Sequence, residues 1–105
     1  MSINSCYETI GRYNALKASL SNVVSSLNAS NTKLSPVSNI IYSAYSVDEN
    51  ETPVVGRVKK VNQDIANTSR YIANVVIPAI DQAISKKRKE IYRLEQEMAA
   101  ERNRL

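Results

Sequence analysis

The sequence predicts an all-α fold: an elongated antiparallel hairpin of two long helices, forming a single domain over residues 1–105. The composition favours helices, because the chain has only two glycines and three prolines and contains no Trp, Phe or His. Apolar residues recur at alternating steps of three and four along both halves, as on one face of a helix. One polar segment separates the halves. We therefore expect a first helix over about 5–46, a turn over about 47–53 and a second helix over about 54–103, with a partner completing a helical bundle.

The first helix is predicted from one heptad frame. The frame consists of Cys6, Ile10, Tyr13, Lys17, Leu20, Val24, Leu27, Asn31, Leu34, Ser38, Ile41 and Tyr45. Further apolar residues accompany it, namely Leu16, Val23, Val37 and Ala44. The stripe is thus wider than the seam of a two-stranded coiled coil, and it suits a bundle of several helices.

Polar residues interrupt this stripe at Lys17, Asn31 and Ser38. They indicate either an imperfect, partly wet seam or buried polar groups that select register and partner. Ser35 and Pro36 match an N-cap followed by a first-turn proline, so we expect a kink or a short break there.

The predicted turn lies in the stretch DENETPVVGRVKK, residues 48–60. Its acidic residues end the apolar stripe and precede the positive end of the next helix. Thr52 is suited to cap that helix, and Pro53 suits its first turn. Gly56 falls just inside the helix, where glycine costs about 1 kcal/mol relative to alanine. A close approach of the other helix or a partner would explain this glycine, and simple tolerance is the alternative.

The second helix repeats the heptad and then shifts it by one residue. The first frame comprises Val54, Val58, Val61, Ile65, Thr68, Ile72, Val75 and Ala79, and the second comprises Ile80, Ile84, Lys87, Ile91, Leu94, Met98, Glu101 and Leu105. Pro78 lies at the shift, where it removes a backbone hydrogen bond and collides with the preceding turn. We expect Pro78 to kink the helix and realign its buried face. A buried strand over residues 75–80 is the alternative, weakened by the same proline.

The residue inventory argues against an enzyme. Cys6 is the only cysteine, so no internal disulfide or zinc cluster of cysteines can form. Without histidine, the usual base that activates a thiol or hydroxyl is missing. We expect no catalytic residue, cofactor or metal. The longest apolar run is too short to span a membrane, and MSINSCYETI lacks the features of a secretory signal, so we expect synthesis in the cytoplasm without a signal peptide.

The net charge of +4 includes a basic run, KKRK, at residues 86–89. Four consecutive helical residues point around most of the circumference, and acidic residues follow, so a solvated helix is the simpler interpretation. Lys86 with Glu90, and Arg93 with Glu97, are spaced for intrahelical ion pairs worth roughly 0.2–0.5 kcal/mol each. Nucleic-acid binding through the run is the alternative.

The apolar stripe supplies the candidate core and interface residues. They are Leu20, Val24, Leu27, Ile41, Val61, Ile65, Ile72, Val76, Ile80 and Ile84. Two helices lying side by side cover only part of a wide stripe, so apolar surface should stay exposed and mark an interface. The pattern does not separate contacts within the hairpin from contacts with a partner.

The segment TPVVGRVKKVNQDIANTSRYIANVVIPAID, with two long helices flanking a turn that carries a glycine, resembles the small helical proteins of type VII secretion. These form the WXG-like superfamily, and the resemblance is closest to the helical partner proteins associated with LXG toxins of Gram-positive bacteria. It implies that the chain binds the helical N-terminal domain of an LXG toxin, alone or together with a second small helical protein. It further implies export with that partner.

The sequence departs from this family at two motifs. Where the family has Trp-x-Gly in the turn, this chain has Val54, Val55 and Gly56. The family's tail signal is an aromatic residue followed by three residues and an acid, whereas here the acid Glu95 comes one position early after Tyr92. Tyr92, Glu95 and Glu97 are therefore candidates for a degenerate export signal, with an ordinary helix end as the alternative.

Two other functions fit the same pattern. A self-associating coiled-coil or bundle scaffold would pair the stripe with its own copy as a homo-oligomer. A basic helical protein would bind nucleic acid through the KKRK run, with strong salt dependence.

Overall fold

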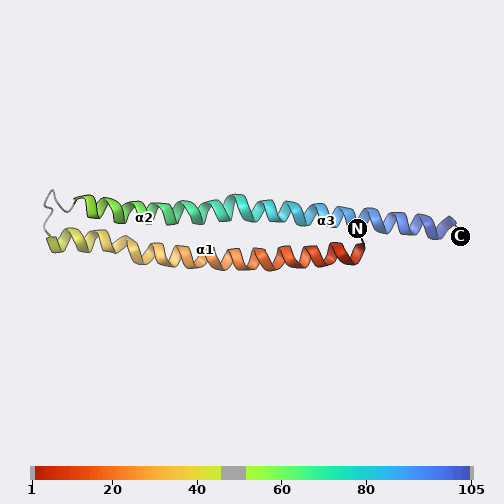
Figure 1. Cartoon of the computed structure of the whole chain (residues 1–105), viewed down its shortest axis with the longest axis horizontal. Coiled ribbons are helices and arrows are strands. Elements are labelled where there is room, and N and C mark those ends of the chain that lie inside the picture. Colours follow the sequence, from red (N-terminus) through yellow and green to blue (C-terminus); the bar gives the residue numbers. More distant parts are fainter. Residues whose placement is uncertain (1, 46–51, 105) are drawn as a thin grey trace.

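The computed structural model describes residues 2–45 and 52–104, which form two long antiparallel helical arms (Figure 1). The first arm is α1 (Ile3–Tyr45). The second arm comprises α2 (Thr52–Tyr71), a π-helical turn η1 (Ile72–Val76) and α3 (Ile77–Arg104). The molecule measures 85 × 16 × 14 Å, and its described residues contain helices without any strand. The predicted all-α hairpin is confirmed.

α1 begins at a capped N-terminus. The Ser2 side-chain Oγ accepts a hydrogen bond from the backbone N–H of Ser5 at 3.1 Å, and the Ser2 carbonyl accepts one from the N–H of Cys6 at 3.1 Å. Serine is among the strongest N-cap residues because its oxygen satisfies an N–H group that the first helical turn leaves without a partner.

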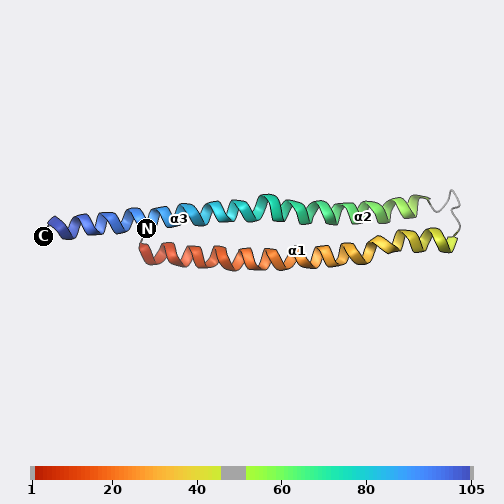
Figure 2. The same ribbon diagram turned by 180° about the vertical axis from the view of Figure 1, so that it is seen from behind.

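α1 then runs through Pro36 without interruption, so the predicted break is absent. Ser35 does not cap a new helix, because its Oγ donates to the carbonyl of Asn31 at 3.1 Å, one turn earlier. A hydroxyl bonded in this way stays compatible with the helix and often bends it. Figure 2 shows the ribbon of α1 changing course slightly in its yellow part, toward the turn.

The second arm begins at Thr52, with Pro53 in the first helical turn as predicted. The predicted turn at about 47–53 otherwise falls mostly outside the described residues, as do the side chains of residues 38–55, including Ile41. Gly56 is exposed, and a Cβ atom built there would meet nothing within 4 Å. Close approach of the other helix therefore does not explain this glycine.

The predicted one-residue shift of the buried face is present, and a π-helical turn produces it. The N–H of Ile77 donates to the carbonyl of Ile72, five residues earlier, instead of four. This wider turn directly precedes Pro78, which has no N–H and whose ring would collide with a carbonyl in a regular turn. The buried side of the arm consequently passes from Val76 to Ile80.

The realignment occurs within one turn of helix rather than at a sharp kink. The ribbon of the second arm continues in nearly the same direction through η1 (Figure 1). After the shift, Gln82 is exposed and Ile84 is buried, as the shifted frame predicts. The alternative of a strand over residues 75–80 is wrong, because the whole segment is helical.

The buried core lies at the end of the hairpin away from the turn. Its buried apolar members are Cys6, Ile10, Ile80, Ile84 and Ile91, and partly buried neighbours packed against them are Ile3, Tyr13, Leu20, Val76 and Leu94. The Cys6 side chain is fully buried and serves as a small apolar packing residue of this core. The core thus joins the start of α1 to α3.

Candidate interaction surface

The seam between the arms follows the predicted frame in α1. From Cys6 to Leu34, every residue of that frame is buried or half-buried against the second arm, including Leu20 and Val24. Among the described residues, α1 therefore presents to its own hairpin the face that the heptad spacing predicts.

In the second arm, the seam before Ile80 differs from the predicted frame at four positions. The buried or half-buried seam residues are Val58, Asn62, Ile65 and Ser69 of α2 and Ile72 and Val76 of η1. The prediction of Val61, Thr68, Val75 and Ala79 in the seam is wrong, since all four are exposed. Polar residues thus enter the seam of α2, while Val61 of α2 and Val75 of η1 face outward.

Hydrogen bonds across the seam explain this choice. The Ser69 hydroxyl donates to Asn28 Oδ1 at 2.8 Å, and Asn62 Nδ2 donates to Ser35 Oγ at 3.2 Å. Ser69 is only 5% exposed, so its hydroxyl needs such a partner. The two bonds lie one heptad apart on both helices, so the same register makes both of them, although Asn62 Oδ1 accepts no hydrogen bond in the described structure.

The three polar residues predicted in the α1 seam differ in their surroundings. Lys17 Nζ lies 2.7 Å from Asp81 Oδ1, with the two side chains 38% and 51% exposed, so the pair contributes about 0–1 kcal/mol. Asn31 is half-buried, and its Oδ1 accepts no hydrogen bond in the described structure. The Ser38 side chain lies outside the described residues.

Replacing Asn31 by leucine is expected to raise the free energy of unfolding by about 1–3 kcal/mol. The substitution removes a buried acceptor without a partner and adds apolar packing at a seam position, where asparagine costs coiled coils stability. Urea denaturation followed by circular dichroism measures the change. Destabilisation would instead mean that Asn31 makes a net favourable polar contact in the hairpin.

Half-exposed aliphatic side chains form an apolar face beside the seam. We define this apolar face as Leu16, Val23 and Val37 of α1 with Val61 and Val75 of the second arm. Four of them are 44–49% exposed: Leu16, Val23, Val61 and Val75. Such a row of large aliphatic side chains is unusual on a surface that stays in water.

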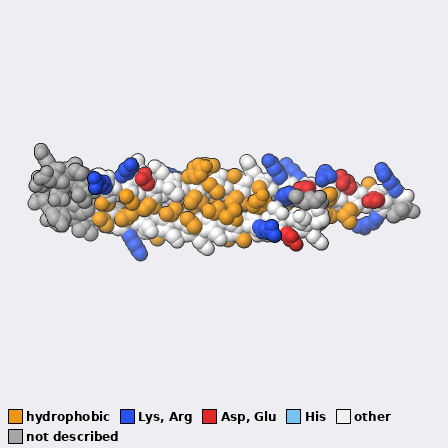
Figure 3. All heavy atoms as spheres, viewed as in Figure 1, with side chains coloured by type: hydrophobic (Ala, Val, Ile, Leu, Met, Phe, Trp, Pro, Cys, Tyr) orange, Lys and Arg blue, Asp and Glu red, His pale blue; other side chains and the backbone are white. Residues whose placement is uncertain are grey.

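The arrangement of these residues places them on one side of the hairpin. Members on the same helix are separated by multiples of seven residues, which is close to two helical turns. Val37 and Val61 line one groove of about 200 Å³ together with Leu34 and Val58, so the rows of the two arms meet on the same side. In the view of Figure 3, hydrophobic side chains form a band along the middle of both arms.

The opposite side of the hairpin is polar. Asn28 lies five residues after Val23, about 140° around the helix, and its bond to Ser69 marks that side. Ser35 occupies the equivalent position one heptad later. The hairpin therefore has one side rich in aliphatic side chains and one side carrying the hydrogen bonds that join its arms.

The three candidate export-signal residues do not gather in one place. Tyr92 is 64% exposed and, with Glu95, lines a groove beside Tyr7. Glu97 instead pairs with Arg93, Nη1 to Oε1 at 2.6 Å, which is the predicted i,i+4 ion pair.

The basic run does not form a single stripe. Lys86, Arg88 and Lys89 are exposed, whereas Lys87 is half-buried. Glu90 pairs with Lys87 at 3.2 Å rather than with Lys86, so the predicted Lys86–Glu90 pair is wrong. This leaves no continuous basic face of the kind that tracks a nucleic-acid backbone.

The remaining candidate interface residues mostly pack within the hairpin. Half-buried in the seam are Leu20, Val24, Leu27, Ile65, Ile72 and Val76, while Ile80 and Ile84 are buried. Of the described candidates, only Val61 belongs to the apolar face. No helix in the described part of the chain has the length and apolar character to cross a membrane. Comparison of the chain with protein-family models, curated proteins and solved structures finds no match in any of the three.

Proposed function

We propose that this chain is a non-enzymatic helical partner that binds the helical N-terminal domain of a type VII-secreted LXG toxin and supports its export. The apolar face is the surface that receives the toxin's helices. The toxin assignment rests on the sequence resemblance, and the mode of binding rests on the exposed apolar side chains of the hairpin.

The single observation that carries the proposal is the uncovered apolar face. Complete burial of a Val or Leu side chain is worth about 1.5–3 kcal/mol, so covering one that is already half-buried gains on the order of 1 kcal/mol. Covering all five residues would contribute a substantial part of the free energy of binding a partner. The main opposing cost is the entropy lost when the partner becomes ordered.

The thin shape of the molecule also favours a helical occupant. Its cross-section of 16 × 14 Å is that of two helices side by side, with one apolar side open. A second helical hairpin laid along that side would convert the pair into a four-helix bundle and bury its own apolar stripe in return.

Co-expression tests the proposal directly. The chain and the N-terminal domain of the LXG toxin encoded beside it are expected to co-purify as a complex of defined mass, more helical per residue than the separate proteins. Light scattering gives the mass, and circular dichroism gives the helicity. A chain that forms a dilution-resistant homo-oligomer through its apolar face, and ignores the toxin domain, would support the scaffold function instead.

A genetic experiment tests the export role. Deleting the gene is expected to reduce the amount of toxin in the culture medium while toxin synthesis continues. Complementation with the unchanged gene serves as the control. Normal secretion of the toxin after the deletion would count strongly against an essential role.

A further inference from the structure

The second arm extends beyond the first at the end away from the turn. Ile3, the first residue of α1, packs against the core beside Leu94, and α3 continues to Arg104. Residues 95–104 are all exposed, and the blue end of α3 passes the N-terminus of α1 in both ribbon views (Figures 1 and 2). We call residues 95–104 the overhang.

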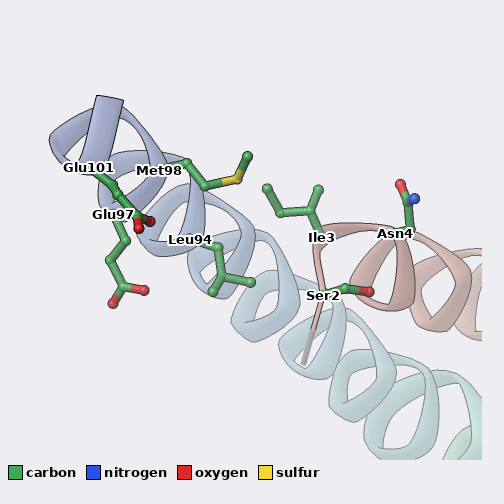
Figure 4. Close-up of a pocket in the computed structure, with 7 residues that line it drawn as sticks. All are labelled: Ser2, Ile3, Asn4, Leu94, Glu97, Met98 and Glu101. Carbon is green, nitrogen blue, oxygen red and sulfur yellow. The ribbon is translucent and has the colours of Figure 1, made fainter. Parts of the chain in front are cut away.

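A groove lies where the overhang leaves α1. It has a volume of about 530 Å³, and its apolar lining consists of Ile3, Leu94 and Met98. Met98 is 48% exposed. Figure 4 shows the side chains of Met98 and Ile3 pointing toward one another across the groove. The stripe that packs α3 on α1 thus continues past Leu94 into the overhang, where Met98 lies across the groove from Ile3.

The charges of the overhang are divided between its two halves. Glu95 and Glu97 lie in the first half, and Arg102 and Arg104 lie in the second together with Glu101. Of these five residues, only Glu97 makes an ion pair within the described chain, with Arg93. The first half is therefore net negative and the second half net positive.

Antiparallel alignment of two overhangs matches these charges. A two-fold axis between Ala99 and Ala100 places both glutamates of one copy opposite both arginines of the other, and it does so twice by symmetry. A parallel alignment in register would bring like charges together.

We propose that the overhang of α3 pairs antiparallel with the overhang of a second copy of this chain, joining two hairpins end to end. Met98 and Leu94 supply the apolar part of the contact beside Ile3. Glu101 takes a seam position opposite Met98 of the second copy, which limits the apolar burial. The interface is short and rich in charge, so the dimer is weak and sensitive to salt.

This pairing does not rest on the proposed toxin partnership. The overhang lies beyond the end of α1, whereas the apolar face runs along both arms. An end-to-end dimer leaves both apolar faces open, so each copy remains able to bind its own helical partner.

Charge variants of the full chain test the pairing. One variant combines Glu95→Arg with Glu97→Arg and has a wholly basic pattern at these positions, and the other combines Arg102→Glu with Arg104→Glu and has an acidic one. Each variant alone is expected to dimerise at least tenfold more weakly than the unchanged chain, because every cross-copy pair becomes repulsive. An equimolar mixture of the two should form a heterodimer, since all four pairs then attract. Sedimentation equilibrium measures the dissociation constant of each dimer.

The control is Arg93→Gln, which removes the intrahelical ion pair of Glu97 while leaving every charge of the overhang in place. It is expected to dimerise like the unchanged chain, and circular dichroism checks that every variant keeps its helicity. Small-angle X-ray scattering should show that the dimer is much longer than the 85 Å of one hairpin, whereas a side-by-side dimer would thicken without lengthening. Unchanged dimerisation of both charge variants, or a monomer throughout, overturns the pairing.

Discussion

Replacing Ile84 by alanine is expected to lower the free energy of unfolding by about 2–5 kcal/mol. Ile84 is only 4% exposed and lies in the cluster of Cys6, Ile10, Ile80 and Ile91. The free energy of unfolding of a domain is commonly only about 5–15 kcal/mol, so this substitution would remove a large share of the stability of a thin hairpin. Thermal and urea denaturation followed by circular dichroism measure the loss.

Leu16→Ala provides the matched control for that experiment. It also truncates a large aliphatic side chain, but Leu16 is 47% exposed on the apolar face of the isolated hairpin. The expected loss is below about 1 kcal/mol. Similar losses at Leu16 and Ile84 would mean that the isolated chain buries its apolar face, and so would contradict the arrangement described above.

Under the proposed function, the double substitution Val23→Glu and Val75→Glu is expected to weaken binding of the LXG toxin's N-terminal domain at least a hundredfold. Both side chains lie on the apolar face, 44% and 48% exposed, so the hairpin alone can keep the glutamates in water. A bound helical partner would remove that water and leave carboxylates without countercharges, which is costly. Isothermal titration calorimetry measures the affinity, and circular dichroism checks the fold.

Glutamates on the opposite side give the control for this experiment. Asn14→Glu with Ser21→Glu adds the same charge to α1 at exposed positions about 160° from Leu16 and Val23. This variant should bind the toxin domain with affinity within a few-fold of the unchanged chain. Equal weakening by both double variants would assign the effect to net charge rather than to the apolar face.

The seam of α1 was predicted correctly from the sequence because the apolar residues of α1 fit a single heptad frame. Leu20, Val24 and Leu27 hold the alternating spacing, and the structure places all three in the seam. Of the kink or short break predicted near Pro36, the break is absent, and the ribbon of α1 only changes course slightly in its yellow part (Figure 2). The helix absorbs the missing hydrogen bond, and Ser35 bonds back to Asn31 instead of capping a new segment.

The hydrophobic pattern predicted part of the α2 seam wrongly. The pattern reports only how apolar each residue of α2 is, whereas the residues that enter the seam also depend on their contacts with α1. Val61 is more apolar than Asn62, but Asn62 finds a hydrogen-bond partner in α1. A two-helix hairpin has room for one seam, so surplus aliphatic residues remain on a flank. The sequence does contain a sign of the apolar face, because Leu16 and Val23 are apolar residues that lie next to the α1 frame and outside it.

The register shift was predictable, but its mechanism was not. The apolar spacing requires one extra residue between Val76 and Ile80, and Pro78 marks the place. A kink and a π-helical turn are both ways to absorb a residue next to proline. Backbone hydrogen bonding decides between them, and here Ile77 bonds to Ile72.

The position of the buried cluster has a consequence for how the chain folds. Cys6 and Ile91 belong to one cluster although nearly the whole sequence separates them, while the described side chains nearest the turn are exposed or only half-buried. The strongest contacts therefore form only after the longest loop has closed. On a ribosome, α1 must wait for α3 to emerge before its best-packed residues find their neighbours. During that interval the aliphatic stripe at the start of α1 has no partner from α3 and stays exposed.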